Sequence, residues 1–319
     1  MDRRQFVKAG TALGLAMSAQ ADAQAQEPRG GAAPAGNVRR VDFWPQGARM
    51  VVSLSMQMEA GAQPERGANG PWGALDTRYP DLPTEKWYEY GIKEGIPRLL
   101  DMFDRRGVKV TSHMVGLSVE KNAALAKEIV ERGHEAAAHG QTWEPQYAKS
   151  PAEERAGYEA NVRAIERATG VRPIGFNAPG MRATPATFGI LQELGFVYHT
   201  DDLSRDEPFL IPVNGRPFVV VPYTFVLNDF QNFENRWRTS SDFAGELKAE
   251  FDALYAESAV RRRMLSVATH DRVAGRPSRA RVVEEFIAYA QSQPGVVFLR
   301  KDEIARFALG SSLTIREGV

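Results

Sequence analysis

The stretch Glu131-Arg-Gly-His-Glu-Ala-Ala-Ala-His-Gly-Gln-Thr-Trp-Glu144 decides the fold that we predict for this chain. Its three consecutive alanines, residues 136–138, suit a tightly packed inner β-strand, and that strand ends on His139. Gly140 follows and allows the backbone to turn sharply directly after the imidazole. Barrels of parallel strands carry their chemistry at the carboxyl ends of the strands. We therefore take His139 as the centre of a candidate site.

A second run of the same form, Met264-Leu-Ser-Val-Ala-Thr-His270, also ends an apolar strand on a histidine. Either histidine alone is compatible with a structural role. Two strands that each bring a histidine to the same edge of a parallel sheet make a functional site the better explanation. We predict that His139 and His270 act together as an acid–base pair.

Predicted strands and helices alternate along the chain. The hydrophobic patterns predict strands at 48–56, 109–115, 135–139, 173–178, 196–200, 264–270 and 296–299, and extended segments at 209–213 and 218–223. They predict helices at 84–106, 118–132, 151–170, 184–194, 241–258, 278–292 and 302–309. This alternation predicts an α/β fold with a parallel sheet, and seven or so units over about 260 residues favour a closed or nearly closed barrel. A doubly wound open sheet is the alternative.

Composition excludes several classes of function. The chain has 319 residues, of which 43% are hydrophobic and 25% charged, as in an ordinary globular protein. Its 40 basic and 40 acidic residues balance, so no overall field attracts nucleic acid or an anionic membrane. The absence of cysteine excludes disulfides, thiolate metal sites and cysteine nucleophiles. No glycine-rich phosphate loop follows a predicted strand, so nucleotide binding has no support.

The amino terminus has the features of an export signal. Twin arginines, Arg3 and Arg4, precede an apolar run at 9–19 and Ala-x-Ala cleavage sites at 21–25. Residues 1–25 therefore resemble a twin-arginine signal peptide, and the apolar run is too short for a permanent membrane anchor. Residues 26–38 are predicted to be a flexible leader, and 39–319 a single catalytic domain. We expect a periplasmic or secreted protein, exported already folded and therefore compatible with a homo-oligomer.

A set of motifs resembles one known superfamily. In chain order these are a strand ending near Glu59, the strand ending His139-Gly, the turn Phe176-Asn-Ala-Pro-Gly180, the strand end Tyr198-His-Thr-Asp-Asp202 and the strand ending on His270. Together they resemble the polysaccharide deacetylase superfamily with its NodB-homology domain. The resemblance covers nearly all of residues 39–319 and implies a distorted, TIM-like (β/α)7 barrel. Asn228-Asp229 and His270-Asp-Arg-Val-Ala-Gly-Arg-Pro-Ser-Arg279 further resemble the branch of metal-independent allantoinases and cyclic-amide hydrolases, near some peptidoglycan deacetylases.

Departures from the deacetylase pattern affect the metal site. Family deacetylases bind a divalent metal through an aspartate and two histidines spaced His-x-x-x-His, and use a second aspartate as base. Here Gln57 holds the base position, and an amide cannot take up a proton. Trp143 holds the second histidine position, and an indole is not a metal ligand. Asn177 holds the position of a family arginine, although Arg182 lies five residues on.

The resemblance leaves two metal ligands, Glu59 and His139, where a hydrolytic zinc site usually needs three. Glu144 or His113 are the residues available to complete a triad in an unusual geometry. We therefore favour no cofactor and keep a divalent metal such as zinc as the alternative.

Amide hydrolysis without a metal needs a base for water, a donor for the oxyanion and an acid for the leaving nitrogen. We assign Glu59 as orienting partner or base, and His139 and His270 as the acid–base pair. Trp143 is predicted to form a flat wall against a planar ring or acetamido group. Asn228, Arg272 and Arg276 are predicted to hold carbonyl or carboxylate oxygens of the substrate, and the alternative for the arginines is plain surface charge.

The sequence gives fewer indications of the roles of the remaining candidate residues. Asp201 is predicted to contact substrate, whereas Asp202 more plausibly caps a following turn. His113 is predicted to be an interior histidine, His134 a surface residue at the mouth of its strand, and His199 is compatible with either orientation.

Three functions remain open. The favoured one is an exported hydrolase of non-peptide carbon–nitrogen bonds that acts on a small cyclic or linear amide or ureide. The second is a metal-dependent N-deacetylase of peptidoglycan or an oligosaccharide. The third is a catalytically impaired domain that binds a glycan.

Overall fold

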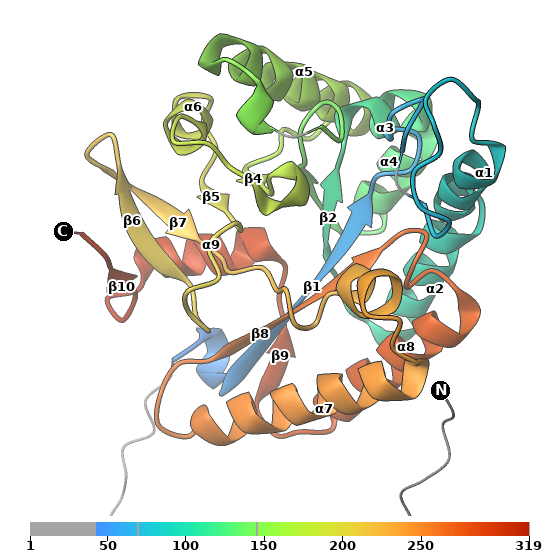
Figure 1. Ribbon diagram of the computed structural model, residues 1–319. Coiled ribbons are helices and arrows are strands. Elements are labelled where there is room, and N and C mark those ends of the chain that lie inside the picture. Colours follow the sequence, from blue (N-terminus) through green and yellow to red (C-terminus); the bar gives the residue numbers. More distant parts are fainter. Residues whose placement is uncertain (1–42, 69, 145, 319) are drawn as a thin grey trace, which may run out of the picture. The chain divides into compact units, whose positions relative to one another are not determined.

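The computed structural model describes residues 43–68, 70–144 and 146–318 (Figure 1). The signal peptide predicted for residues 1–25 and the leader predicted for residues 26–38 lie outside this range. Within it, no helix combines the length and the apolar character that crossing a bilayer requires.

A parallel sheet forms the centre of the fold. Its consecutive strands are β8 Met264–His270, β1 Met50–Met58, β2 Thr111–Met114, β3 Glu135–Ala138, β4 Gly175–Phe176, β5 Tyr198–His199 and β7 Arg216–Val220, each parallel to its neighbour. Three further strands extend it: β6 Phe209–Val213, antiparallel to β7, and β9 Val296–Phe298 and β10 Ile315–Arg316, parallel to β1 and β6. The predicted α/β fold is therefore confirmed, with β8 at its predicted bounds.

The strands curve into a barrel that is not closed by a ladder. The described parts of β7 and β8 form no strand pair, and the segment after β7 reaches β8 through an isolated bridge, Asn228 to Ala268. One hydrogen bond spans this bridge, from the Ala268 amide to the carbonyl of Leu227 at 3.0 Å. The barrel is thus the distorted, TIM-like form, with a seam between β7 and β8.

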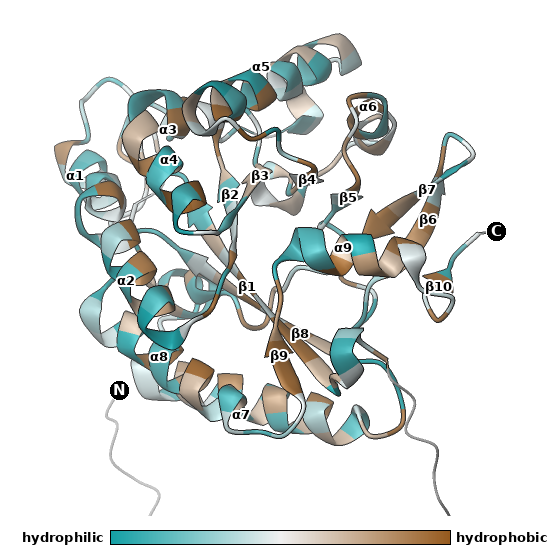
Figure 2. Ribbon diagram, turned by 180° about the vertical axis from the view of Figure 1, so that it is seen from behind, coloured by the Kyte–Doolittle hydropathy of each residue, from teal (hydrophilic) through white to brown (hydrophobic). Residues whose placement is uncertain are grey.

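Helices surround the strands (Figure 1). They are α1 Leu82–Tyr90, α2 Ile96–Arg106, α3 Gly116–Lys121, α4 Ala123–Glu131, α5 Pro151–Thr169, α6 Thr187–Glu193, α7 Ser240–Glu257 and α8 Pro277–Gln291. Figure 2 shows hydrophilic and hydrophobic residues alternating along helices such as α7, as expected for helices with one face on a sheet.

The alternation of side chains along β1 separates two layers. Val52, Leu54 and Met56 belong to the apolar cluster shared with the surrounding helices. Successive side chains of a strand point to opposite faces, so the residues between them point into the barrel. Ser53 and Gln57 are among these, and both are buried. From Ser53 onward, the side chains of β1 that face the barrel interior are therefore polar, unlike the layers of branched apolar residues usual in such barrels.

Helix α9 Lys301–Gly310 packs against the amino-terminal part of the barrel. Its apolar residues join the cluster that contains Val51 and Met264, the first barrel-facing residues of β1 and β8. Lys301 is completely buried, and its ammonium donates to Ser53 and Ser266, each at 3.4 Å. Burial lowers the pKa of Lys301 to about 7, although Glu135 opposes this shift.

The helix predicted at 84–106 differs in its details. It begins at Leu82, because Asp81 rather than Thr84 supplies the capping side chain. A π-helical turn, η2 Gly91–Gly95, separates α1 from α2. A Cβ at Gly91 would lie 2.6 Å from the Asp271 carboxyl carbon, and one at Gly95 only 1.8 Å from the Asp271 carbonyl oxygen. The two glycines therefore let this helix pack directly onto the loop that follows β8.

Other predicted helices shift more modestly. The helix predicted at 118–132 is two helices, α3 and α4, separated at Asn122. Helix α6 begins at Thr187 rather than 184. Helix α5 begins at its predicted residue, 151, after a capping box in which Ser150 accepts a hydrogen bond from the Glu153 amide.

Candidate active site

A pocket of about 720 Å³ opens at the carboxyl ends of the barrel strands. Six of the eight side chains predicted for the site line it: Glu59, His139, Trp143, Asp201, Asn228 and His270. The other two predicted residues, Arg272 and Arg276, are not among its lining residues. The structure therefore brings together side chains that lie as far as 211 positions apart in the sequence, from Glu59 to His270.

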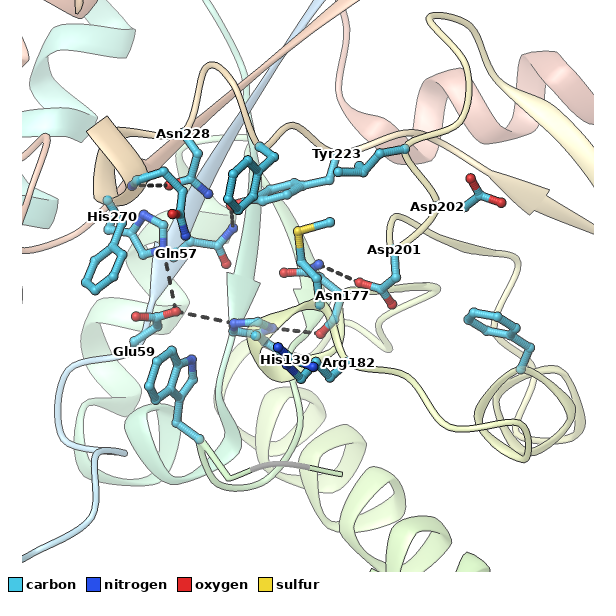
Figure 3. A pocket seen from close by; sticks show the side chains of 18 residues that line it. Gln57, Glu59, His139, Asn177, Arg182, Asp201, Asp202, Tyr223, Asn228 and His270 are labelled. Atoms are coloured by element: carbon cyan, nitrogen blue, oxygen red, sulfur yellow. Dashed lines mark hydrogen bonds and ion pairs between the residues drawn. The ribbon is translucent and has the colours of Figure 1, made fainter. Parts of the chain in front are cut away.

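Glu59 follows β1 directly and lies between the two histidines (Figure 3). Its Oε1 atom is 3.3 Å from Nε2 of His139 and 3.8 Å from Nε2 of His270. Its Oε2 atom accepts a hydrogen bond from Nη1 of Arg272 at 2.7 Å. One carboxylate thus connects both predicted acid–base residues.

The pKa of Glu59 decides between its two predicted roles. Burial alone would raise this pKa, but the charges of Arg272 and His270 and the hydrogen bond to His139 hold it well below its usual range. A carboxylate that releases its proton so readily is a weak base. Glu59 is therefore suited to orient and stabilise the histidines rather than to take a proton from water.

His139 is fixed through its other ring nitrogen. Nδ1 donates a hydrogen bond to the carbonyl oxygen of Asn177 at 2.7 Å, which leaves Nε2 facing Glu59. The backbone amide of His139 also donates to Oδ1 of Asn161 on α5 at 3.0 Å. With Nδ1 protonated, Nε2 is the atom through which His139 exchanges a proton in the pocket.

His270 forms a dyad with Asp229. Its Nδ1 donates to Oδ1 of this wholly buried aspartate at 2.6 Å, and its backbone amide donates to Oδ2 at 2.7 Å. Burial by itself lowers the pKa of His270, but the carboxylates of Asp229 and Glu59 outweigh burial and raise it above its usual value. His270 therefore holds a proton more readily than an ordinary histidine, which would suit it to act as an acid.

Asp229 was not among the predicted site residues. The sequence contained a signal for it, because Asn228-Asp229 was part of the resemblance to the allantoinase branch. It lies in an irregular segment, however, and nothing in that segment indicates that it contacts His270.

Arg272 lies behind the site rather than in it. Its guanidinium is almost completely buried and stacks against Tyr88 and Trp87, with the carbon of the guanidinium 4.4 and 4.8 Å from their ring centroids. The neighbouring Asp271 accepts hydrogen bonds from the backbone amides of Glu59 and Ala60, each at 3.0 Å. These two residues hold the Glu59 carboxylate and its backbone, so the substrate-contact role predicted for Arg272 does not fit its position.

Arg276 also departs from its predicted role. Its guanidinium lies 3.5 Å from the centroid of Tyr90, outside the pocket. Gly275, the residue before it, lies against Gly95 of η2, so the loop after β8 places Arg276 beside α1 rather than in the pocket.

Tyr223 and Asn228 supply hydrogen-bond donors to the pocket. Gln57 donates from Nε2 to the Tyr223 hydroxyl at 2.7 Å and to Nδ1 of His113 at 3.1 Å, which leaves the tyrosine proton available. Burial raises the pKa of Tyr223 well above its usual value, so the phenol stays neutral. Oδ1 of Asn228 already accepts from the Gln231 amide at 3.2 Å, which leaves its NH2 group to donate.

Asp201 is held by the turn after β4. It accepts hydrogen bonds from Nδ2 of Asn177 at 2.8 Å and from the Ala178 amide at 3.0 Å. Burial raises the pKa of Asp201 to about 6. Asp202 caps a turn, as predicted, by accepting from the Ser204 amide at 2.9 Å, and it also lines the pocket.

The remaining histidines are structural. His113 is buried beside Gln57, as predicted. His199 packs between Phe188 and Phe218, and burial lowers its pKa to about 4. The prediction of a surface position for His134 is wrong, because only 2% of this residue is exposed and its Nδ1 accepts from the Val110 amide.

Comparison with known proteins identifies the family. The family model described as polysaccharide deacetylase matches residues 86–199. A crystal structure of a probable polysaccharide deacetylase from Pseudomonas aeruginosa PAO1 is 31% identical, with a TM-score of 0.79, over 85% of this chain and 94% of that one. The chain belongs to the polysaccharide deacetylase family. Membership makes it a hydrolase of carbon–nitrogen bonds other than peptide bonds.

Two further relatives show the range of this family. The crystal structure of the Puue allantoinase is 29% identical, with a TM-score of 0.79, over 90% of this chain and 99% of that one. A peptidoglycan deacetylase from Helicobacter pylori is 31% identical over 137 residues, which are 43% of this chain and 46% of that protein.

Polysaccharide deacetylases generally use a divalent metal ion, so the donor set of this family member decides whether one fits. Across residues 43–68, 70–144 and 146–318, no three His, Asp or Glu side chains are arranged to hold a metal. The guanidinium of Arg272 already occupies one oxygen of Glu59. Glu144, considered above as a third ligand, instead accepts from Thr142 and is 56% exposed. This set does not fit a divalent ion.

Proposed function

We propose that this protein hydrolyses a carbon–nitrogen bond of a small cyclic or linear amide or ureide, and that it does so without a metal ion. The observation that carries the proposal is the position of Glu59, which is paired with Arg272 on one oxygen and faces both histidines with the other. A buried cation at this carboxylate supplies the positive charge that a metal would otherwise bring.

In this proposal His139 is the base. Neutral Nε2 of His139 takes a proton from a water molecule as the water oxygen bonds to the amide carbon. Glu59, 3.3 Å away, stabilises the resulting imidazolium. A carboxylate also stabilises the imidazolium in hydrolases with a triad, although there it contacts the ring nitrogen opposite the one that takes the proton.

His270 is the acid. Held as an imidazolium by Asp229, it gives its Nε2 proton to the leaving nitrogen as the carbon–nitrogen bond breaks. The products are a carboxylic acid and an amine or urea nitrogen, and one proton has moved from water to the leaving group. Proton return from His139 to His270 through solvent restores the starting state.

The carbonyl oxygen needs donors as negative charge develops on it. The Tyr223 hydroxyl and the Asn228 amide line the same pocket and have protons available, so we assign them to the oxyanion. Loss of one such donor typically costs 10²–10³-fold in kcat, that is about 3–4 kcal/mol. Trp143 lines the pocket as a flat wall for a planar ring.

The test combines elemental analysis with a substrate screen. Protein purified without added metal, and then treated with chelator, is assayed on cyclic ureides, cyclic imides and acetamido sugars. We expect turnover of a ureide or imide at an unchanged rate and less than stoichiometric metal. Chelator-sensitive turnover by the wild type would refute the metal-free mechanism.

A second candidate function is metal-dependent N-deacetylation of peptidoglycan or an oligosaccharide. The observation that favours it is the 31% identity to the Helicobacter pylori peptidoglycan deacetylase. In this case the acetamido sugar is the better substrate in the same screen, and added zinc raises its turnover.

A further inference from the structure

Arg182 is a positively charged residue of the pocket that has no part in the proposed mechanism. It follows the turn η4 Pro179–Met181, and it is the only lysine or arginine among the described residues that line the pocket. Within the described part of the chain its guanidinium forms no hydrogen bond or ion pair. Glu59 and His270, by contrast, are paired with Arg272 and Asp229. Arg182 is therefore an available cation beside a site whose central charges are already balanced.

The two residues before Arg182 have an unusual backbone conformation. Gly180 and Met181 both have left-handed conformations, with φ of 63° and 58°. For methionine this conformation is strained, and such strain concentrates at functional sites. The turn is held by a hydrogen bond from the Met181 amide to the Ala178 carbonyl at 2.8 Å. Two consecutive left-handed residues reverse the chain directly before Arg182.

This turn lies close to the catalytic centre. A Cβ at Gly140, the residue after His139, would lie 3.1 Å from the ring of Pro179, so the end of β3 and the turn are in contact. Figure 3 shows Arg182 and His139 on the same side of the pocket in that view. A substrate group bound by Arg182 would therefore lie near the base.

The residues around Arg182 favour a carboxylate as the substrate group that it binds. A guanidinium presents a planar fork of N–H donors that matches a carboxylate in a bidentate pair. Asp201 and Asp202 also line the pocket, and their negative charges oppose a doubly charged phosphate more than a singly charged carboxylate. Arg182 is exposed, so a substrate can reach it from solvent, and the aromatic side chains of Trp143 and Phe188 line the same pocket.

We infer that Arg182 determines the specificity of this pocket by binding a carboxylate of the substrate, so that the preferred substrates are amides or ureides that carry one negative charge. The inference rests on the proposed function, because it places the carboxylate and the scissile bond in one pocket.

The test uses two rings of equal size. One is a five-membered cyclic ureide with a carboxymethyl substituent, and the other has a carbamoylmethyl substituent, which is neutral and of the same shape. We expect wild type to favour the carboxymethyl ring at least tenfold in kcat/KM. Arg182→Gln should reduce that preference at least tenfold, mainly through KM, and Arg182→Lys should keep part of it. Arg216→Gln, at an exposed arginine outside the pocket, is the matched control and should keep all of it.

Equal treatment of the two rings by wild type, or an unchanged preference in Arg182→Gln, would overturn the inference. If wild type hydrolyses neither ring, the proposed function fails for this substrate class, and calorimetric titration with the intact rings then decides the inference alone. Tighter binding of the carboxymethyl ring, lost in Arg182→Gln, supports it. Absence of binding to either ring overturns it as well.

Discussion

At the scale of residues, the contact between His270 and Asp229 leads to a prediction about pH. The carboxylate of Asp229 raises the pKa of His270 against the opposing effect of burial. In Asp229→Asn this attraction is gone and only the charge of Glu59 still opposes burial, so the pKa of His270 falls. An acid works only while protonated, so the alkaline limb of the kcat/KM profile should move to lower pH.

The measurement is the pH dependence of kcat/KM for wild type and Asp229→Asn, with His270→Ala as the reference for complete loss of the acid. We expect activity near neutral pH to fall roughly 10²-fold or more in both variants. If the alkaline limb stayed where it is in wild type, a group other than His270 would be the acid. Thermal unfolding of His270→Ala serves as the control, since a cooperative transition shows that the variant is folded.

A second prediction about a single residue distinguishes the two candidate functions through a substitution of Trp143. In the metal-free mechanism its indole contacts a planar ring, a contact worth roughly 1 kcal/mol, so Trp143→His should raise KM and gain nothing from zinc. In the metal-dependent mechanism the new histidine adds a ligand to Glu59 and His139, so zinc affinity and deacetylation should both rise. Zinc titration with parallel assays on an acetamido sugar and a cyclic ureide distinguishes these outcomes.

The sequence was sufficient to predict the residues that strands deliver to the pocket. Glu59, His139 and His270 each end or follow a strand, and a strand of known direction determines where its last residue lies. Asp229 and Tyr223 come from the irregular segment after β7, whose path depends on long-range contacts that leave no periodic pattern. Arg272 and Arg276 follow β8 as expected, but their orientation depends on the helix packed against that loop.

At the scale of elements, the π-helical turn η2 supports Glu59 indirectly. Its glycines let the helix contact Asp271, and Asp271 holds the backbone of Glu59. In Gly95→Ala the new methyl group would overlap the Asp271 carbonyl oxygen, so the loop or the helix must move. We expect the free energy of unfolding to fall by about 1–3 kcal/mol, together with a loss of kcat.

Gly157→Ala is the matched control for this prediction. Gly157 lies within α5, and a Cβ there meets nothing within 4 Å. The better helix propensity of alanine should stabilise that variant by up to about 1 kcal/mol and leave activity unchanged. Chemical denaturation and steady-state assays of both variants provide the comparison. Equal stability of the two variants would contradict the prediction, because it would show that the space between residue 95 and Asp271 can accommodate a methyl group.

The starts of the helices illustrate what local sequence determines. Helix α5 starts at its predicted residue, 151, because Ser150 and Glu153 satisfy each other's backbone amides without help from other elements. The interruption of the 84–106 helix by η2 was not predictable, because the residue on which this turn packs, Asp271, lies more than 170 positions away in the sequence. Local signals therefore predict where helices begin better than where they deform.

At the scale of the whole molecule, the predicted signal peptide gives a test of location. Residues 1–25 lie outside the described structure, so export is a proposal based on Arg3, Arg4 and the Ala-x-Ala sites. We expect the mature chain to begin near Gln26 and the replacement of both arginines by lysine to block export. Amino-terminal sequencing of the periplasmic fraction is the measurement. Uncut protein in the periplasm would contradict cleavage.

The seam between β7 and β8 affects how the barrel deforms. Elsewhere, moving one barrel strand away from its neighbour breaks the hydrogen bonds of a ladder, whereas here side chains supply most of the links between the two edges. Besides the bridge between Asn228 and Ala268, Ser266 donates to the Pro222 carbonyl at 2.6 Å and His270 is bound to Asp229. Side-chain hydrogen bonds rather than a backbone ladder therefore keep the barrel closed along this line. Asn228 contributes both to the bridge and to the wall of the pocket, so the closure of the barrel and the shape of the pocket depend on the same segment.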